Sequence, residues 1–222
     1  MKNRPINVSV VHFGCAKNMV ESERIIALLR SVPGVSVIQD IGRADYIIYN
    51  TCSFLESSRK ELRDYFFDHK RVFHPRQKHI LFGCLPLLIQ NSEDSSRYLE
   101  ELKSLLRKFD IEMIHTLEEL GAFFCPSQTI HRSARELQTP GAYAYLKIAD
   151  GCNNHCSYCL IPTIRGQFYS RPLEEIVEEA QWLIEKKGIR EINLVSQDTA
   201  LYGSDMGSSL SDLLVKLNDI PG

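Results

Sequence analysis

The chain has 222 residues, of which 44% are hydrophobic and 24% are charged, so it can bury one good core or two modest ones. Its formal net charge of -2 offers no broad basic surface for nucleic acid, and its apolar stretches are shorter than the roughly 20 residues that a membrane helix needs. The amino terminus lacks an apolar signal core, and the seven cysteines cluster in turns, which favours a cytoplasmic protein that uses thiols as metal ligands rather than in disulfides.

Buried strands alternate with helices in the first part of the chain. Strands are expected at 8–13, 46–49 and 80–82, and helices at 19–29, 59–67 and 96–109. This alternation predicts an α/β fold with a doubly wound parallel sheet, covered by helices on both faces. Two helix starts have the spacing of a capping box, Asn18 with Glu21 and Ser58 with Glu61.

A stretch without clear periodicity, residues 125–140, is expected to be a linker because it has proline near both ends. Beyond it we expect a strand at 143–148, a helix from Pro172 to about Lys187 that Gly188 ends, a strand at 191–195 and a helix at 210–217. These are two βα units of a larger parallel sheet or barrel that the remaining sequence is too short to complete.

Three cysteines follow the expected strand 143–148 in a C-x3-C-x2-C arrangement: Cys152, Cys156 and Cys159, here called the loop cysteines. Ferredoxin clusters and structural zinc sites normally take four protein ligands. Three thiolates therefore indicate an iron–sulfur cluster with one iron left open to a small molecule. The alternative is a zinc site that His155 or another histidine completes, but three ligands within one eight-residue loop favour the cluster.

Three further cysteines, Cys15, Cys52 and Cys84, each follow the carboxyl end of an expected strand and are here called the strand-end cysteines. Those ends share one edge of a parallel sheet, where ligands bind, and adjacent glycines let the backbone approach a bulky group. We therefore expect a second three-cysteine cluster. The alternative for each is a buried, unreactive thiol, which is what we expect of Cys125. Lone histidines at 69, 74, 79, 115 and 131 are expected to be solvated or capping residues.

The segment from Gly151 to Pro172, GCNNHCSYCLIPTIRGQFYSRP, resembles the radical S-adenosylmethionine (SAM) enzymes, and within them the methylthiotransferases. Their loop runs G-C-x3-C-x2-C-x-x-P-x-x-R-G-x3-S-R-P. The segments 14–18, 50–54 and 83–84 resemble that family's own three-cysteine domain. Residues 196–205, SQDTALYGSD, are similar to the branch that modifies an aspartate of the twelfth small-subunit ribosomal protein, whereas the tRNA-modifying branch usually has a Gly-Gln-Asn-Val type of sequence there.

The resemblance implies two 4Fe–4S clusters and SAM as cofactors. The loop cysteines would be catalytic, since their cluster would bind SAM and cleave its sulfonium bond to give a 5′-deoxyadenosyl radical. The cluster on the strand-end cysteines would carry the sulfur that is methylated and transferred to the β-carbon of the aspartate. Tyr158 would lie against the adenine, with core packing as the alternative. Arg165 and Arg171 would contact carboxylates of cofactor or substrate, or else brace the loop.

The resemblance also implies a domain order: an amino-terminal methylthiotransferase domain at 1–124, the linker, and an incomplete radical-SAM (β/α) barrel from 141. Family members continue through a six-unit partial barrel and a small β-rich domain, so we expect an amino-terminal portion that binds clusters but turns over poorly. Expected partners are the ribosomal protein, an electron donor such as a flavodoxin or ferredoxin, and a sulfur source, with no membrane. A tRNA adenosine methylthiotransferase and a non-catalytic iron–sulfur or zinc module remain as alternatives.

Overall fold

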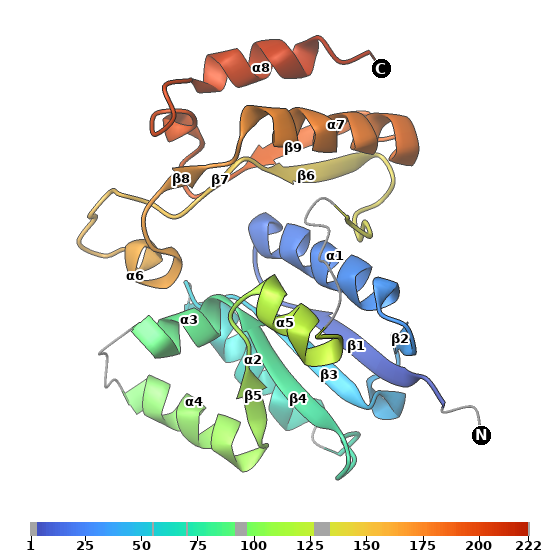
Figure 1. Cartoon of the computed structure of the whole chain (residues 1–222). Coiled ribbons are helices and arrows are strands. Elements are labelled where there is room, and N and C mark those ends of the chain that lie inside the picture. The colour runs from blue at the N-terminus through green and yellow to red at the C-terminus, as the bar shows by residue number, and fades with distance from the viewer. Residues whose placement is uncertain (1–3, 55, 70, 92–96, 127–133, 222) are drawn as a thin grey trace. The chain divides into compact units, whose positions relative to one another are not determined.

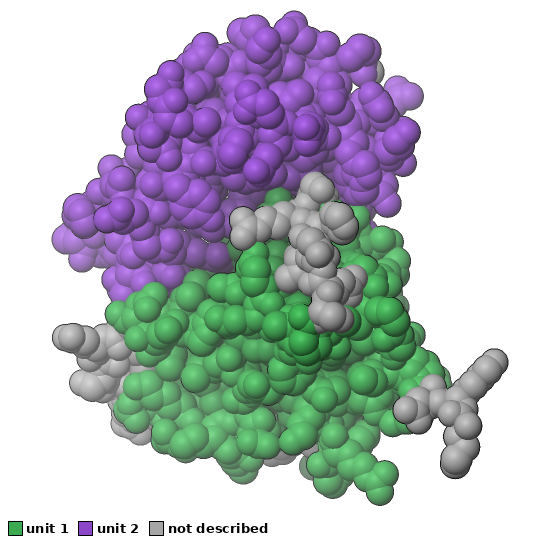
Figure 2. All heavy atoms as spheres, in the orientation of Figure 1, with its two compact units in different colours: residues 1–136 green, residues 137–222 purple. Residues whose placement is uncertain are grey.

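The chain forms two compact units, residues 1–136 and 137–222, which Figure 2 colours separately. The computed structural model describes residues 4–54, 56–69, 71–91, 97–126 and 134–221. Among these residues, none of the helices has both the length and the apolar character needed to cross a lipid bilayer.

The first unit is built on a five-stranded parallel sheet with strand order β2-β1-β3-β4-β5 (Figure 1). Its strands are β1 (Ile6–His12), β2 (Val35–Val37), β3 (Tyr46–Thr51), β4 (Lys78–Gly83) and β5 (Ile111–Met113). Its helices are α1 (Ala16–Ser31), η1 (Ile41–Arg43), α2 (Glu56–His69), α3 (Cys84–Asn91), α4 (Arg97–Lys108) and α5 (Leu117–Phe124). The expected α/β class and the parallel sheet are confirmed.

Helices cover both faces of this sheet because successive side chains of a strand point to opposite sides. Val8, Ile48 and Ile80 pack against α1 and α5 on one face. On the other face Tyr49 packs against Phe66 of α2, with ring centroids 4.8 Å apart. Figure 1 shows α1 and α5 in front of the sheet and α2 behind it. The doubly wound arrangement places the carboxyl ends of β1, β3 and β4 side by side.

Both expected capping boxes are wrong. Cys15 is the N-cap residue of α1, so Asn18 lies inside the first turn and its amide instead donates to backbone carbonyls outside the helix. α2 begins at Glu56, so Ser58 also lies inside its helix and is buried.

The second unit contains two parallel strands, β6 (Tyr143–Lys147) and β9 (Glu191–Val195), which confirms the expected βα units. Between them runs α7 (Leu173–Lys187), and α8 (Leu210–Asn218) follows the short 3-10 helix η2 (Thr199–Leu201). Gly188 ends α7 in the left-handed conformation, with φ of 68°, as expected for a C-cap. Side chains of β6, α7 and α8 share one apolar core.

An antiparallel ribbon that was not expected holds the cysteine loop. It pairs β7 (Ala149–Asp150) with β8 (Tyr169–Ser170), and α6 (Ile161–Arg165) lies between them in sequence. The loop cysteines therefore lie in a segment that is closed at its base by strand pairing.

The expected linker is described only in part, since residues 127–133 lie outside the described residues. After them, Arg135 is buried and forms an ion pair with Glu23 of α1. The backbone N–H of Glu136 donates to the carbonyl of Glu23 at 3.0 Å. Residues 135 and 136 are thus anchored on the first unit.

Candidate metal centres

The strand-end cysteines lie on three strands that pair as neighbours. Cys15 follows β1 and caps α1, Cys52 directly follows β3, and Cys84 is the first residue of α3 after β4. Because β1 pairs with β3 and β3 with β4, the three residues occupy adjacent carboxyl ends of the sheet. Cys52 and Cys84 are buried and Cys15 is exposed.

Two glycines let these strand ends approach each other closely. Gly14 has a φ of 100°, and a Cβ built on it would lie 2.4 Å from Cβ of Cys52. Gly83 has a φ of 90°, and its Cβ would lie 2.5 Å from Oδ1 of Asn50 and 2.6 Å from the carbonyl oxygen of Thr51. Any other residue would be strained and would push the strand ends apart. The sequence therefore requires glycine beside the thiols.

Two buried oxygens at this edge, Oδ1 of Asn50 and Oγ of Ser53, have no hydrogen-bond partner within the part of the chain that the structure describes. They lie on either side of Cys52 in sequence. The Nδ2 group of Asn50 is engaged, because it donates to Oγ of Ser22 at 2.8 Å. Unpaired buried polar atoms are costly and rare. Three thiols together with two open polar atoms fit a site that receives a further group, such as a cluster held by three cysteines.

The loop cysteines lie between β7 and α6, outside regular secondary structure. Cys152 is buried, Cys156 is exposed and Cys159 is intermediate. The backbone N–H of Cys159 donates to the carbonyl of Cys156 at 3.0 Å, which folds the segment into a turn. The backbone N–H of Asn154 points to Sγ of Cys152 at 3.4 Å. The loop thus offers three thiols on a short, partly exposed turn.

Neither set of thiols forms a finished ligand group. Within the described ranges, no three Cys, His, Asp or Glu side chains are grouped as they would be around a metal ion. His155, the fourth ligand of the zinc alternative, is exposed and belongs to no such group. Metal ligands commonly reach their final arrangement only with the metal bound. The structure places the backbone of all six cysteines, and their assignment as ligands stays a prediction.

The start of the cysteine loop is pressed against the residues that follow α6. Gly151 has a φ of 72°, and a Cβ built on it would lie 2.0 Å from the carbonyl oxygen of Gln167. The backbone N–H of Cys152 donates to the carbonyl of Gly166 at 3.2 Å. This close approach fixes the backbone from which the first loop cysteine extends.

A buried carboxylate, that of Asp150, anchors the same backbone. Its Oδ1 accepts from the N–H of Gly151 at 2.9 Å and from Nε2 of Gln197 at 2.7 Å. Its Oδ2 pairs with Nζ of Lys147 and lies 3.6 Å from Nη1 of Arg165. Two almost fully buried cations thus lie beside one carboxylate at the base of the loop. Sequence reasoning missed Lys147 and Asp150, although their i, i+3 spacing directly before the cysteines was a usable signal.

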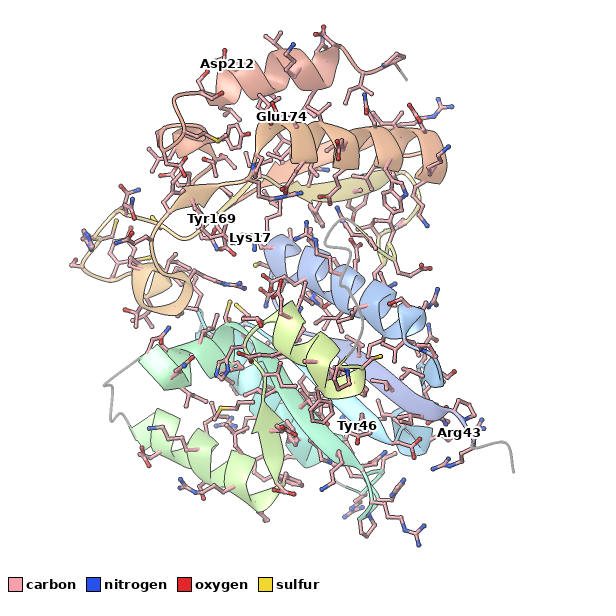
Figure 3. All side chains as sticks on the ribbon, viewed as in Figure 1. Lys17, Arg43, Tyr46, Tyr169, Glu174 and Asp212 are labelled. Atoms are coloured by element: carbon pink, nitrogen blue, oxygen red, sulfur yellow. The ribbon has the colours of Figure 1, made fainter. Side chains whose placement is uncertain are left out.

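The structure shows the surroundings of Arg171 and Tyr158, two of the three residues expected to contact the cofactor or substrate. Nη2 of Arg171 lies 2.8 Å from Oε2 of the buried Glu179, and its Nη1 donates to the carbonyl of Lys147 at 2.6 Å, which favours the bracing alternative. Tyr158 is 83% exposed, so core packing is wrong for its ring. Tyr169 of β8, labelled in Figure 3, is also exposed. A contact of Tyr158 with a ligand stays a prediction.

Cys125 and the lone histidines are not expected to be ligands of these centres. Cys125 is the C-cap residue of α5 and is half-buried. His79 is buried and its Nδ1 lies 2.9 Å from Oη of Tyr49, so the expectation of a solvated or capping residue is wrong there. Burial lowers the pKa of His79 to about 4. His131 lies outside the described residues.

Comparison with protein families assigns each unit to a known domain. Residues 7–103 match the model described as uncharacterized protein family UPF0004. Residues 146–220 match the model of the radical SAM superfamily. The first match includes all strand-end cysteines and the second includes all loop cysteines.

Several curated proteins are similar to nearly the whole chain. One named ribosomal protein uS12 methylthiotransferase RimO, from Thermoanaerobacter sp. (strain X514), is 35% identical over 97% of this chain and 51% of its own length. Proteins with the same name from Chlorobium phaeobacteroides and Pelobacter propionicus are 36% and 37% identical over 96% and 97% of this chain. This chain spans about half the length of the curated relatives it matches.

Proposed function

We propose that the chain, whose two units match a UPF0004 domain and a radical SAM domain, acts in the methylthiolation of ribosomal protein uS12. The observation that carries this proposal is the similarity to uS12 methylthiotransferases, which extends over 97% of the chain and therefore through both units. The acceptor in this proposal is the β-carbon of an aspartate of uS12.

Each unit would hold one 4Fe–4S cluster, the first on the strand-end cysteines and the second on the loop cysteines. When bound, the clusters and SAM would supply two things: one-electron cleavage of the sulfonium bond, which yields the 5′-deoxyadenosyl radical, and the sulfur that is transferred. Support comes from the two three-thiol sets and from the unpaired buried oxygens beside Cys52. In both sets the chain supplies three thiols, one fewer than the four protein ligands of a ferredoxin cluster or a structural zinc site.

Side chains around the loop would hold and orient the cofactor. The carboxylate of Asp150 fixes the backbone N–H of Gly151 and so the position from which Cys152 extends. Arg165, which lies 3.6 Å from that carboxylate at the base of the loop, would contact the carboxylate of SAM, since a guanidinium group binds carboxylates well. The exposed ring of Tyr158 offers a flat apolar surface to the adenine. Arg171 would brace β6 and α7 rather than touch the cofactor.

The proposed reaction needs two partners besides uS12. A one-electron donor such as a flavodoxin or ferredoxin would reduce the radical SAM cluster, and a sulfur source would replenish the sulfur consumed in each turnover. Both needs, together with a ribosomal substrate, correspond to a cytoplasmic location. The relatives are about twice as long as this chain. Turnover should therefore be tested with the protein that the cell expresses from its own gene.

Mass spectrometry of uS12 and of total tRNA from a strain that lacks the gene tests this function. We expect the methylthio group on uS12 to disappear, and to return with the wild-type gene or with a Cys125→Ala control, since Cys125 lies outside both sets. A Cys156→Ala gene should not restore it. An unchanged uS12 would overturn the proposal, and loss of a methylthio group from tRNA adenosine would establish the tRNA alternative instead.

A further inference from the structure

We propose that Asn18 is a positioning residue whose buried amide ties together the three strand ends that carry the strand-end cysteines. The inference deepens the proposed function, because its consequence for cluster binding rests on those cysteines being ligands. The sequence pattern does not indicate this role, because the spacing of Asn18 and Glu21 predicts a helix cap instead. The hydrogen bonds of the folded unit reveal it.

The amide of Asn18 reaches all three strand ends. Its Nδ2 donates to the carbonyl of Phe13 at 3.3 Å, just past β1, and to the carbonyl of Thr51 at 2.8 Å, at the end of β3. Its Oδ1 lies 3.8 Å from Sγ of Cys84, the residue that follows β4, whose thiol can donate to it while no metal is bound. Thr51 directly precedes Cys52, and Phe13 lies two residues before Cys15. One side chain thus bridges three segments that are far apart in sequence.

The position of Asn18 makes these contacts hard to replace. The residue is fully buried, in the first turn of α1 next to Lys17, which Figure 3 labels. Its own carbonyl accepts a hydrogen bond from Nδ2 of Asn50 at 2.7 Å. Loss of Asn18 would remove the amide that donates to these two carbonyls, and leaving buried carbonyls without a donor is costly.

Positioning of this kind matters for a metal site because three ligands from separate strands must face one group. Partners behind the ligands fix their orientation, and replacing them typically lowers metal affinity by about 10- to 100-fold. An aspartate at this position would present acceptors to the Phe13 and Thr51 carbonyls and would add negative charge beside thiolates. We therefore expect Asn18→Asp to bind a cluster more weakly than Asn18→Ala.

The first experiment needs no iron. In the metal-free chain, the rates at which iodoacetamide alkylates Cys52 and Cys84 are measured by mass spectrometry for wild type, Asn18→Ala and Asn7→Ala. Asn7 is a matched control at the other end of β1, where its Nδ2 donates to the carbonyl of Arg43 at 3.3 Å. We expect roughly tenfold faster alkylation in Asn18→Ala, because lost hydrogen bonds ease local opening, and no change in Asn7→Ala.

The second experiment measures cluster loading in chains whose loop cysteines are replaced by alanine, so that only the strand-end site is counted. Half-loading of Asn18→Ala should require about 10- to 100-fold more iron and sulfide than wild type. Asn18→Gln keeps an amide but places it one methylene further from the backbone. If Asn18→Ala does not fold, this variant provides the test: it should need more iron and sulfide for half-loading than wild type, by a smaller factor than expected for Asn18→Ala.

The two experiments separate two kinds of failure. If this background binds no cluster even with Asn18 present, the proposed ligand role of the strand-end cysteines fails, while the alkylation rates still decide whether Asn18 positions them. Alkylation rates in Asn18→Ala equal to those in wild type and Asn7→Ala would overturn the positioning role itself. Equal iron loading of the wild-type and Asn18 variants would overturn its consequence for the cluster.

Discussion

Gly151, at the start of the cysteine loop, combines a left-handed backbone with a contact that excludes a side chain. The chain offers a control, since Gly166 also has a φ of 72° but no atom within 4 Å of the position where its Cβ would lie. Its ψ of -158° places it in a region that is essentially restricted to glycine, so we expect Gly166→Ala to lower the free energy of unfolding by about 1–3 kcal/mol. Gly151→Ala should cost a further 1–3 kcal/mol or so from overpacking.

Chemical denaturation of the second unit measures this difference. Trp182 of α7 is the single tryptophan of the sequence, so its fluorescence reports the unfolding of that unit. Equal losses of stability in the two variants would show that the loop base is not packed against Gln167 as the structure has it.

The buried imidazole of His79 makes the stability of the first unit depend on pH. Burial lowers its pKa from 6.5 to about 4. Between these values the unfolded chain takes up a proton that the native chain does not. The contribution of His79 is therefore complete above pH 6.5 and is lost as the pH falls toward 4, by up to about 3 kcal/mol.

Replacement of His79 by phenylalanine tests this contribution. Urea unfolding of the metal-free chain between pH 7 and 4 should show a weaker dependence of stability on pH in His79→Phe than in wild type. The exposed His74 serves as the control, and His74→Phe should keep the wild-type dependence. The same pH dependence in all three chains would contradict the burial of a neutral imidazole.

At the scale of single residues, the sequence predicted where the cysteines lie and failed to predict what surrounds them. An apolar run followed by a cysteine is a local pattern, so the sequence alone predicts both the end of the strand and the thiol that follows it. The contacts of Asn18 and Asp150 could not, because their partners lie up to 66 residues away for Asn18 and 47 for Asp150. The burial of His79 likewise depends on aromatic side chains from α2 and from beyond α4.

Among the elements, the long periodic helices and the central strands were predictable, and the short ones were not. β2 and β5 have three residues each and β7 and β8 have two, which is too few for a periodicity to appear. These strands exist because a neighbour pairs with them. α3 was hidden because Pro86 lies in its first turn, where proline is tolerated but interrupts the apolar pattern.

The ion pair between Glu23 of α1 and Arg135 determines how the chain leaves the first unit. Both Nε and Nη2 of Arg135 donate to Oε2 of Glu23, and both side chains are fully buried. We expect Glu23→Gln or Arg135→Met to lower the free energy of unfolding by about 3–5 kcal/mol, because each change removes one member of a buried ion pair.

An exposed pair from the same two segments provides the comparison. Arg30 lies 2.7 Å from Glu136, and Arg30→Met should cost only about 0–1 kcal/mol. A double-mutant cycle on Glu23 and Arg135 should give a large coupling energy in denaturation experiments. Equal effects of Arg135→Met and Arg30→Met would show that the buried pair does not anchor this segment.

At the scale of the whole molecule, each of the two units presents three thiols after the carboxyl ends of parallel strands. In the first unit three neighbouring strands contribute one cysteine each, and in the second a single loop after β6 and β7 contributes all three. Ligand sites at this end of parallel strands follow from the common direction of the strands. Two units with one such site each are what the proposed chemistry needs: one site for SAM and one for sulfur.

The central claim is therefore that the chain holds two separate clusters. It is tested most directly by iron and acid-labile sulfide analysis of anaerobically reconstituted protein: wild type, a triple alanine variant of the strand-end cysteines, and one of the loop cysteines. We predict about eight irons per wild-type chain and about four in each variant. About four irons in wild type, unchanged when the strand-end cysteines are removed, would contradict it.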